Sequence, residues 1–212
     1  MKIIRHVALL GTVTLLVTAL SARASLITGT DPGFASDSLT IDTQTELAWL
    51  NLSFTADLSY NQVLAGMQPG GIFNDYTFAT SQEVAGLYAD AGISAAGYYS
   101  LSTPAIGSLI SLVGSTTMNN GQPGFVAISG TSDGPGVQEA PSIYATGVNG
   151  TDFYFVSDGT EADSTSYGVS TSLPGVSDWL VKTVPEPSMG SIGVLGLMIC
   201  AGVRRFNLRR HR

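Results

Sequence analysis

Between Ser25 and Pro187 the sequence contains no histidine, cysteine or arginine, and only one lysine, Lys182. These absences exclude Ser-His-Asp and Cys-His nucleophilic sites, zinc sites built on histidine or cysteine, and arginine clamps from this segment. A disulfide within it is excluded as well, because the one cysteine of the chain is Cys200. The stability of the segment must therefore come from its hydrophobic core.

Acidic residues are what the segment has instead. All 16 Asp and Glu residues lie between Ser25 and Pro187, together with one of the nine Lys and Arg residues, so this segment carries a net charge near −15. Such a charge repels nucleic acid and anionic membrane surfaces and attracts divalent cations and cationic partners. Solubility outside the cell is the alternative reason for the acidity. The chemistry that remains is that of carboxylates, such as glycoside hydrolysis by two carboxyl groups about 5 to 10 Å apart. Since the sequence reveals no such pair, we expect no catalytic residues and no enzyme.

The N-terminal residues have the organisation of a secretory signal peptide. Lys2 and Arg5 precede an apolar stretch from Val7 to Leu20, and small residues, Ala22 and Ala24, occupy the two positions that signal peptidase reads. The pattern predicts a signal peptide over residues 1–24, cleaved after Ala24. An uncleaved N-terminal anchor is the alternative, although the apolar stretch is short for a membrane span.

The C-terminal residues 184–212 have three parts. Val184-Pro185-Glu186-Pro187 is held extended by its prolines, and an uncharged stretch from Met189 to Val203 follows. As a helix this stretch would reach roughly 22 Å, short of the roughly 30 Å hydrocarbon core. The basic end begins with Arg204 and Arg205 and predicts a transmembrane helix with its C-terminus in the cytoplasm. A buried core helix is the alternative for so short a stretch.

This tail closely resembles the PEP-CTERM sorting signal of Gram-negative bacteria, on Val184 to Pro187, the Gly-containing apolar stretch and the arginines beyond it. The resemblance implies export, transient retention in the inner membrane, and processing by an exosortase, usually in organisms that make exopolysaccharide. The expected final location is the cell surface or the extracellular matrix.

Residues 25–183 are long enough for one domain with a real core. Capping boxes at Ser59–Gln62 and Thr80–Glu83 predict two short helices, and Pro104 predicts the start of a third. Alternating apolar residues predict strands at 39–42, 46–52, 72–78, 125–129, 142–148, 152–157 and 179–181. The Gly-rich stretches at 130–136 and 158–168 are expected to be loops. We therefore expect an α+β fold with short helices in the first half, a mainly antiparallel sheet, and one additional C-terminal hydrophobic helix.

A second resemblance covers the block from Leu39 to Tyr88. The block is similar to a pattern in exported bacterial proteins, the Lcl-type C-terminal domain. The residues that carry the similarity are Leu39-Thr40-Ile41-Asp42, Leu47-Ala48-Trp49-Leu50, Ser59-Tyr60 with Val63-Leu64, and Phe78-Ala79-Thr80 with Glu83-Val84 and Leu87. This resemblance implies a C-type-lectin-like fold.

Candidate binding residues are few. Trp49 and Trp179 lie in apolar strands and are expected in the core rather than stacked on a sugar. Tyr98 and Tyr99 are in a more loop-like stretch and could stack on a sugar, or serve only in packing. Asp158, Glu161 and Asp163 crowd one Gly-containing loop, where their oxygens could gather around calcium; a solvated loop without metal is the alternative. No other cofactor is expected.

These observations favour an exported surface or matrix protein that has signal peptidase and exosortase as partners, passes through the inner membrane, and binds extracellular polysaccharide but no nucleic acid. The alternative from a different class is a carboxylate-dependent glycoside hydrolase or other carbohydrate-active enzyme.

Overall fold

The computed structural model describes residues 25–148, 151–159 and 166–184, which form three sheets and three α-helices. The first sheet has the order β1-β2-β3-β14-β4, formed by Leu26–Gly29, Leu39–Asp42, Leu47–Leu50, Leu180–Thr183 and Thr77–Phe78. The second has the order β13-β7-β10-β11-β5, formed by Val176–Asp178, Gln122–Ile128, Ser142–Val148, Thr151–Ser157 and Gly97–Ser100, with β6 (Thr117–Asn119) paired to β7. The third is small, with the order β12-β9-β8, formed by Ser166–Gly168, Val137–Glu139 and Ser132–Gly134.

The helices begin where the sequence predicts. In α1 (Tyr60–Gly66) the hydroxyl of Ser59 and the side chain of Gln62 form a capping box, and Thr80 and Glu83 do the same for α2 (Ser81–Asp90). Two backbone N–H groups at each N-terminus are thereby satisfied. The third helix, α3 (Pro104–Val113), has proline in its first turn and buries Ile106, Leu109, Ile110 and Val113. The α+β fold is confirmed, with α1 and α2 in the first half of the chain and α3 at its middle.

The last strand closes the first sheet. β14 lies between β3 and β4, although more than 100 residues separate it from them in sequence. This pairing brings Trp179 against Trp49, and both indoles are at most 1% exposed, with ring centroids 5.6 Å apart at 86°. Both tryptophans are core residues, as predicted. Of the strand pairs described, only β13 with β7 is parallel.

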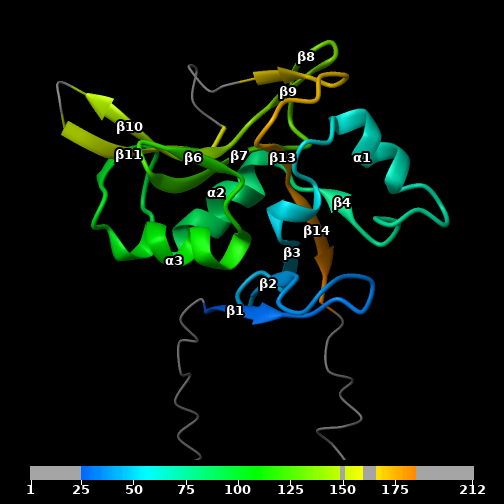
Figure 1. Cartoon of the computed structure of the whole chain (residues 1–212). Coiled ribbons are helices and arrows are strands. Elements are labelled where there is room, and N and C mark those ends of the chain that lie inside the picture. The colour runs from blue at the N-terminus through cyan, green and yellow to red at the C-terminus, as the bar shows by residue number, and fades with distance from the viewer. Residues whose placement is uncertain (1–24, 149–150, 160–165, 185–212) are drawn as a thin grey trace, which may run out of the picture.

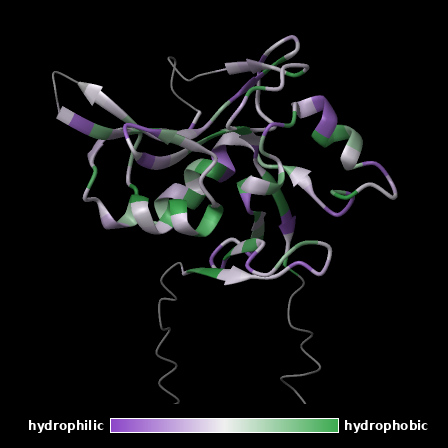
Figure 2. Ribbon diagram, in the orientation of Figure 1, coloured by the Kyte–Doolittle hydropathy of each residue, from purple (hydrophilic) through white to green (hydrophobic). Residues whose placement is uncertain are grey.

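Helices and the small sheet lie on opposite faces of the second sheet. In Figure 1, α2 and α3 lie on one side of β7, β10 and β11, and the β12-β9-β8 sheet lies on the other side near β7 and β13. Figure 2 shows that apolar residues are concentrated in α3 and in the strands behind it. The apolar side chains of α3 form the main core together with Phe125 of β7, Ile143 of β10 and Tyr154 of β11. A smaller cluster under the small sheet contains Ile128, Val176 and Tyr167.

Three expectations about local structure were wrong. Of the strand expected at 72–78, only Thr77–Phe78 forms, and Phe73 and Tyr76 are joined by a turn hydrogen bond. Their rings are buried in a second apolar cluster, whose other members are Leu39, Ala48, Leu50, Val63 and Leu180. The apolar spacing at 72–78 therefore reflects packing rather than strand pairing. The two stretches expected as loops contain β8 and β12, because their Ser- and Gly-rich backbones pair with β9. Tyr98 and Tyr99 are in strand β5 rather than a loop.

Both ends of the described domain meet at one turn. The Thr43 N–H donates to the Ser25 carbonyl at 3.2 Å, and the Val184 N–H donates to the Glu46 carbonyl at 2.8 Å. These partners flank the turn between β2 and β3, at the lower end of the molecule in Figure 1. The expected C-terminal helix lies outside the described residues, within which no helix is long and apolar enough to cross a membrane.

Candidate functional site: an aromatic platform

Four aromatic side chains gather on the outer face of the second sheet, at the end that the small sheet does not cover. They are Tyr98 on β5, Phe153 and Phe155 on β11, and Tyr144 on β10, and we call them the aromatic platform. Tyr98 is 62% exposed and the other three are partly exposed. No described helix or strand lies over this end of the sheet in Figure 1.

Strand register places three of these rings in one row. Phe155 is directly opposite Tyr144 on one neighbouring strand and Tyr98 on the other. The ring centroids of Phe155 and Tyr144 are 5.6 Å apart, and those of Phe155 and Tyr98 are 5.3 Å apart. Because side chains directly opposite each other on paired strands are neighbours, the row is a direct consequence of the register.

A second row lies beside the first, two residues along each strand. Phe153 is opposite Thr146 of β10 and Ser100 of β5, and its ring is 6.5 Å from that of Tyr98. The second row thus combines one ring with two hydroxyl groups. A hydroxyl group both donates and accepts hydrogen bonds, so the two rows offer apolar faces next to polar groups.

Alternation along each strand sends the neighbouring tyrosines to the opposite face. Tyr154 is buried in the main core, and Tyr99 packs against it. The Tyr99 hydroxyl donates to the Ala95 carbonyl at 2.5 Å. Of the two residues that the sequence singles out for sugar binding, only Tyr98 is therefore on the platform, because adjacent residues of a strand point to opposite faces.

Tyr167 of β12 borders the platform on the side of Tyr144. Burial is the main cause that raises the pKa of both phenols, and repulsion from the charge of a neighbouring phenol is the second. For Tyr144 the neighbour is Tyr98, and for Tyr167 it is Tyr144. These hydroxyl groups therefore stay neutral near pH 7, where they can donate hydrogen bonds.

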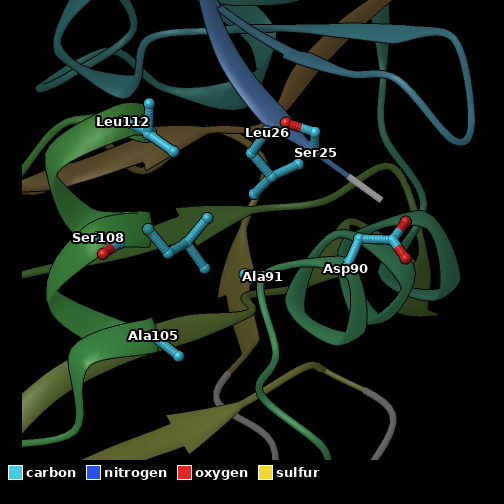
Figure 3. A pocket seen from close by; sticks show the side chains of 8 residues that line it. Ser25, Leu26, Asp90, Ala91, Ala105, Ser108 and Leu112 are labelled. Atoms are coloured by element: carbon cyan, nitrogen blue, oxygen red, sulfur yellow. The ribbon is translucent and has the colours of Figure 1, made fainter. Parts of the chain in front are cut away.

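A pocket of about 250 Å³ lies between β1 and the helices (Figure 3). Most of its lining is apolar and comes from β1, the end of α2 and α3: Leu26, Ala91, Ala105, Leu109 and Leu112, with Ser25, Ser108 and Asp90. The carboxyl group of Asp90 is hydrogen-bonded to that of Asp42, which is fully buried. Burial, followed by the hydrogen bond and the charge of Asp42, raises the pKa of Asp90 to about 6. Asp90 can therefore exchange a proton near neutral pH.

Two further carboxyl groups are distinctive. Asp178 on β13 is 1% exposed, and neither of its carboxyl oxygens has a hydrogen-bond partner among the described residues, so burial raises its pKa to about 8. Asp31 is bound by the ammonium group of Lys182 and by the Tyr76 hydroxyl, which donates to it at 2.6 Å. Burial opposes these contacts, but together with the Gly33 N–H they hold the pKa of Asp31 at about 2.

The remaining predicted sites lie largely outside the described residues. Asp158 is described and half-buried, whereas Glu161 and Asp163 are not. In the described parts of the chain no three His, Cys, Asp or Glu side chains gather as metal ligands. Of the sorting and cleavage residues, only Val184 is described, and it packs against the second apolar cluster; Ala22, Ala24, Pro185, Glu186, Pro187, Arg204 and Arg205 lie outside.

Sequence reasoning missed Tyr144, Phe153 and Phe155 as site residues. Part of their signal was present, because β11 places Phe153 and Phe155 at alternate positions on the face opposite the buried Tyr154, and β10 places Tyr144 on the face opposite the buried Ile143. What was absent was the register that aligns them with Tyr98.

The chain matches no protein-family model, no curated protein and no solved structure.

Proposed function

We propose that this chain is an exported cell-surface or matrix protein whose acidic domain binds extracellular polysaccharide through the aromatic platform. The observation that carries the proposal is the row formed by Tyr144, Phe155 and Tyr98. Sugar rings present apolar C–H faces edged by hydroxyl groups, and an aromatic ring covers such a face with a large apolar area at little cost in side-chain entropy. The Thr146 hydroxyl, beside Phe153, lies where it can bond the edge of the sugar. The Ser100 hydroxyl, on the other side of Phe153, already accepts from the Ser102 N–H and is hydrogen-bonded to the Ser102 hydroxyl.

Delivery to the surface rests on the signal peptide and the PEP-CTERM tail. The position of the domain ends supports it, because Ser25 and Val184 both hydrogen-bond to the turn between β2 and β3. A chain held in the inner membrane by its tail would keep this end of the domain near the bilayer. Strands β10 and β11, which carry three of the four platform residues, lie away from this end in Figure 1, so the platform would face away from the bilayer.

Polysaccharide binding is tested with the chain recovered after export and the polysaccharide of the producing organism. Affinity electrophoresis in gels that contain the polysaccharide should retard the protein. Retardation should be lost when Tyr98 and Phe155 are both replaced by alanine. Equal mobility of the two proteins would contradict the proposal.

Sorting is tested separately. Replacing Pro185, Glu186 and Pro187 with alanine should leave the uncut protein in the inner membrane, detected by immunoblotting of membrane fractions. Normal processing of this variant would refute the role assigned to these residues. Replacing Pro123, which lies within the domain, with alanine is the matched control and should leave processing unchanged.

A carboxylate-dependent glycoside hydrolase is the second candidate, favoured by the Asp42–Asp90 pair beside a pocket. Asp90, with a pKa of about 6, could donate a proton near neutral pH. Directly hydrogen-bonded carboxyl groups, however, are closer together than the roughly 5 Å or more that glycosidases use. Release of reducing ends from the polysaccharide, abolished in Asp90→Asn, would establish this function in place of simple binding.

The Lcl-type resemblance, and with it a C-type-lectin-like fold, belongs to the same proposal. The residues that carry the resemblance form β2, β3, α1, β4 and α2.

A calcium-dependent ligand site in the 158–163 loop is tested by thermal melting, where millimolar calcium should raise the melting temperature. An unchanged melting temperature would remove calcium from the proposal.

A further inference from the structure

The geometry of the aromatic platform restricts the physical form of its ligand. Phe155 is tilted by 52° to Tyr144 and by 56° to Tyr98, and Phe153 stands at 75° to Tyr98. A crystalline polysaccharide surface presents its sugar rings in one plane, so it could lie flat on only one of these rings at a time. A single chain rotates about each glycosidic bond and can follow the tilt from ring to ring.

The spacing of the row fixes how such a chain lies. Neighbouring ring centroids are 5.6 and 5.3 Å apart, a little more than the distance of about 4.8 Å between paired strands. This separation is similar to the length of one pyranose unit in an extended chain. A chain that runs across the strands therefore brings successive sugars over Tyr144, Phe155 and Tyr98, beside the hydroxyl groups of Thr146 and Ser100.

The charge of the domain restricts the chemistry of the ligand. The segment from Ser25 to Pro187 carries a net charge near −15, and its one basic residue is Lys182. Lys182 lies on β14 of the first sheet and is bound to Asp31. A polysaccharide with uronate, sulfate or phosphate groups would find no cationic side chain at the platform and would be repelled by the whole domain.

Resting on the proposed function, we infer that the aromatic platform binds single, soluble polysaccharide chains without anionic groups, which lie across β10, β11 and β5. A second copy of this protein is the competing occupant of the face. It is disfavoured because its own domain would bring another charge near −15 to the contact.

The experiment compares three probes: a soluble neutral β-glucan, a soluble polyuronate and insoluble crystalline cellulose. Binding to the chain recovered after export is measured by calorimetry for the soluble probes and by depletion for cellulose. The β-glucan is expected to bind, with an affinity that changes little as salt is raised, because no charge pairs are formed. Binding to the other two probes should be undetectable at the same concentrations.

Three substitutions assign the binding to the platform. Tyr98→Ala should weaken β-glucan binding about tenfold, because one stacked ring is lost, whereas Tyr98→Phe should retain it. The matched control is Ile72→Ala, which removes an apolar side chain that is similarly exposed, at 65%, but lies in the turn between α1 and β4, outside the strands of the platform. It should leave binding unchanged. Unaltered melting temperatures check that all three variants are folded.

The failures are distinguishable. Binding of polyuronate or cellulose as tightly as the β-glucan would overturn this inference and leave polysaccharide binding in place. An affinity unchanged in Tyr98→Ala, or binding to none of the probes, would overturn both this inference and the proposed role of the platform. A concentration-dependent dimer of the native chain that disappears in Tyr98→Ala would assign the platform to a second copy and overturn the inference.

Discussion

Asp178 lies on β13 with its carboxyl group in the interior of the domain. Its backbone is fixed on both sides by the Thr55 hydroxyl, which receives a hydrogen bond at 3.0 Å from the Asp178 N–H and donates one at 2.9 Å to the Asp178 carbonyl. The carboxyl oxygens themselves have no partner among the described residues. Replacing Asp178 with asparagine, which has the same shape and no charge, should therefore change how the stability of the domain depends on pH.

The sign follows from the direction of the pKa shift. Burial raises the pKa of Asp178 from 3.8 to about 8 in the folded state. The folded domain thus binds the proton more tightly than the unfolded chain does. The protonated carboxyl group therefore contributes to the free energy of unfolding in full below pH 3.8, and this stabilisation is lost as pH rises toward 8. At 1.36 kcal/mol per pKa unit the loss amounts to about 4 kcal/mol by pH 7. That is a large part of the 5 to 15 kcal/mol by which domains are ordinarily stable.

Asp178→Asn removes this dependence. Its free energy of unfolding should be several kcal/mol higher than that of the native protein at pH 8, and equal or slightly lower at pH 4, because the amide is as poorly hydrogen-bonded as the protonated acid. Urea titrations from pH 4 to pH 8 measure the free energy of unfolding of both proteins, with the fluorescence of the buried Trp49 and Trp179 as the signal.

The matched control is Asp37→Asn. Asp37 is exposed and has a φ of 56°, a conformation that asparagine tolerates well, so this variant should keep the native pH dependence. A difference between Asp178→Asn and the native protein that is constant from pH 4 to pH 8 would refute the reasoning, since it would mean that Asp178 does not titrate in the folded state.

Other residues give further predictions for stability. Lys182→Met should lower the free energy of unfolding at pH 7 by about 2 kcal/mol, because Asp31 is left charged without its partner, and adding Asp31→Asn should restore part of the loss in urea titrations. Asp90→Asn should remove a loss of stability that the native protein shows between pH 4 and pH 6, since the raised pKa favours the folded state only while Asp90 is protonated; parallel melting curves across this range would contradict it. Thr80→Ala should cost about 1 kcal/mol by removing the cap of α2, while Thr80→Ser should cost little, and equal melting temperatures for the two variants would exclude the cap.

Local signals in the sequence account for the helices and for the clearest strands. Ser59 and Thr80 cap their helices because a hydroxyl group and an N3 side chain can satisfy orphan N–H groups without help from the rest of the fold. The strand at 142–148 forms with the bounds that its alternation predicts. Strands without such alternation, among them β1, β5 and β13, were not predicted, because partners far away in sequence decide whether they pair.

The chemistry that residues 25–187 lack can be read from the sequence alone, because the absence of His, Cys and Arg from this segment holds in any fold. The same sequence predicts a leader and a sorting tail, because the signals for both are short and contiguous. The fold, by contrast, is needed to see that Tyr98 lies beside Phe155 in one row with Tyr144, whereas Tyr99 packs against the core. These three rings come from strands up to 57 positions apart in the chain. Their alignment depends on register, which is set by turns and by the packing of the opposite face against α2 and α3.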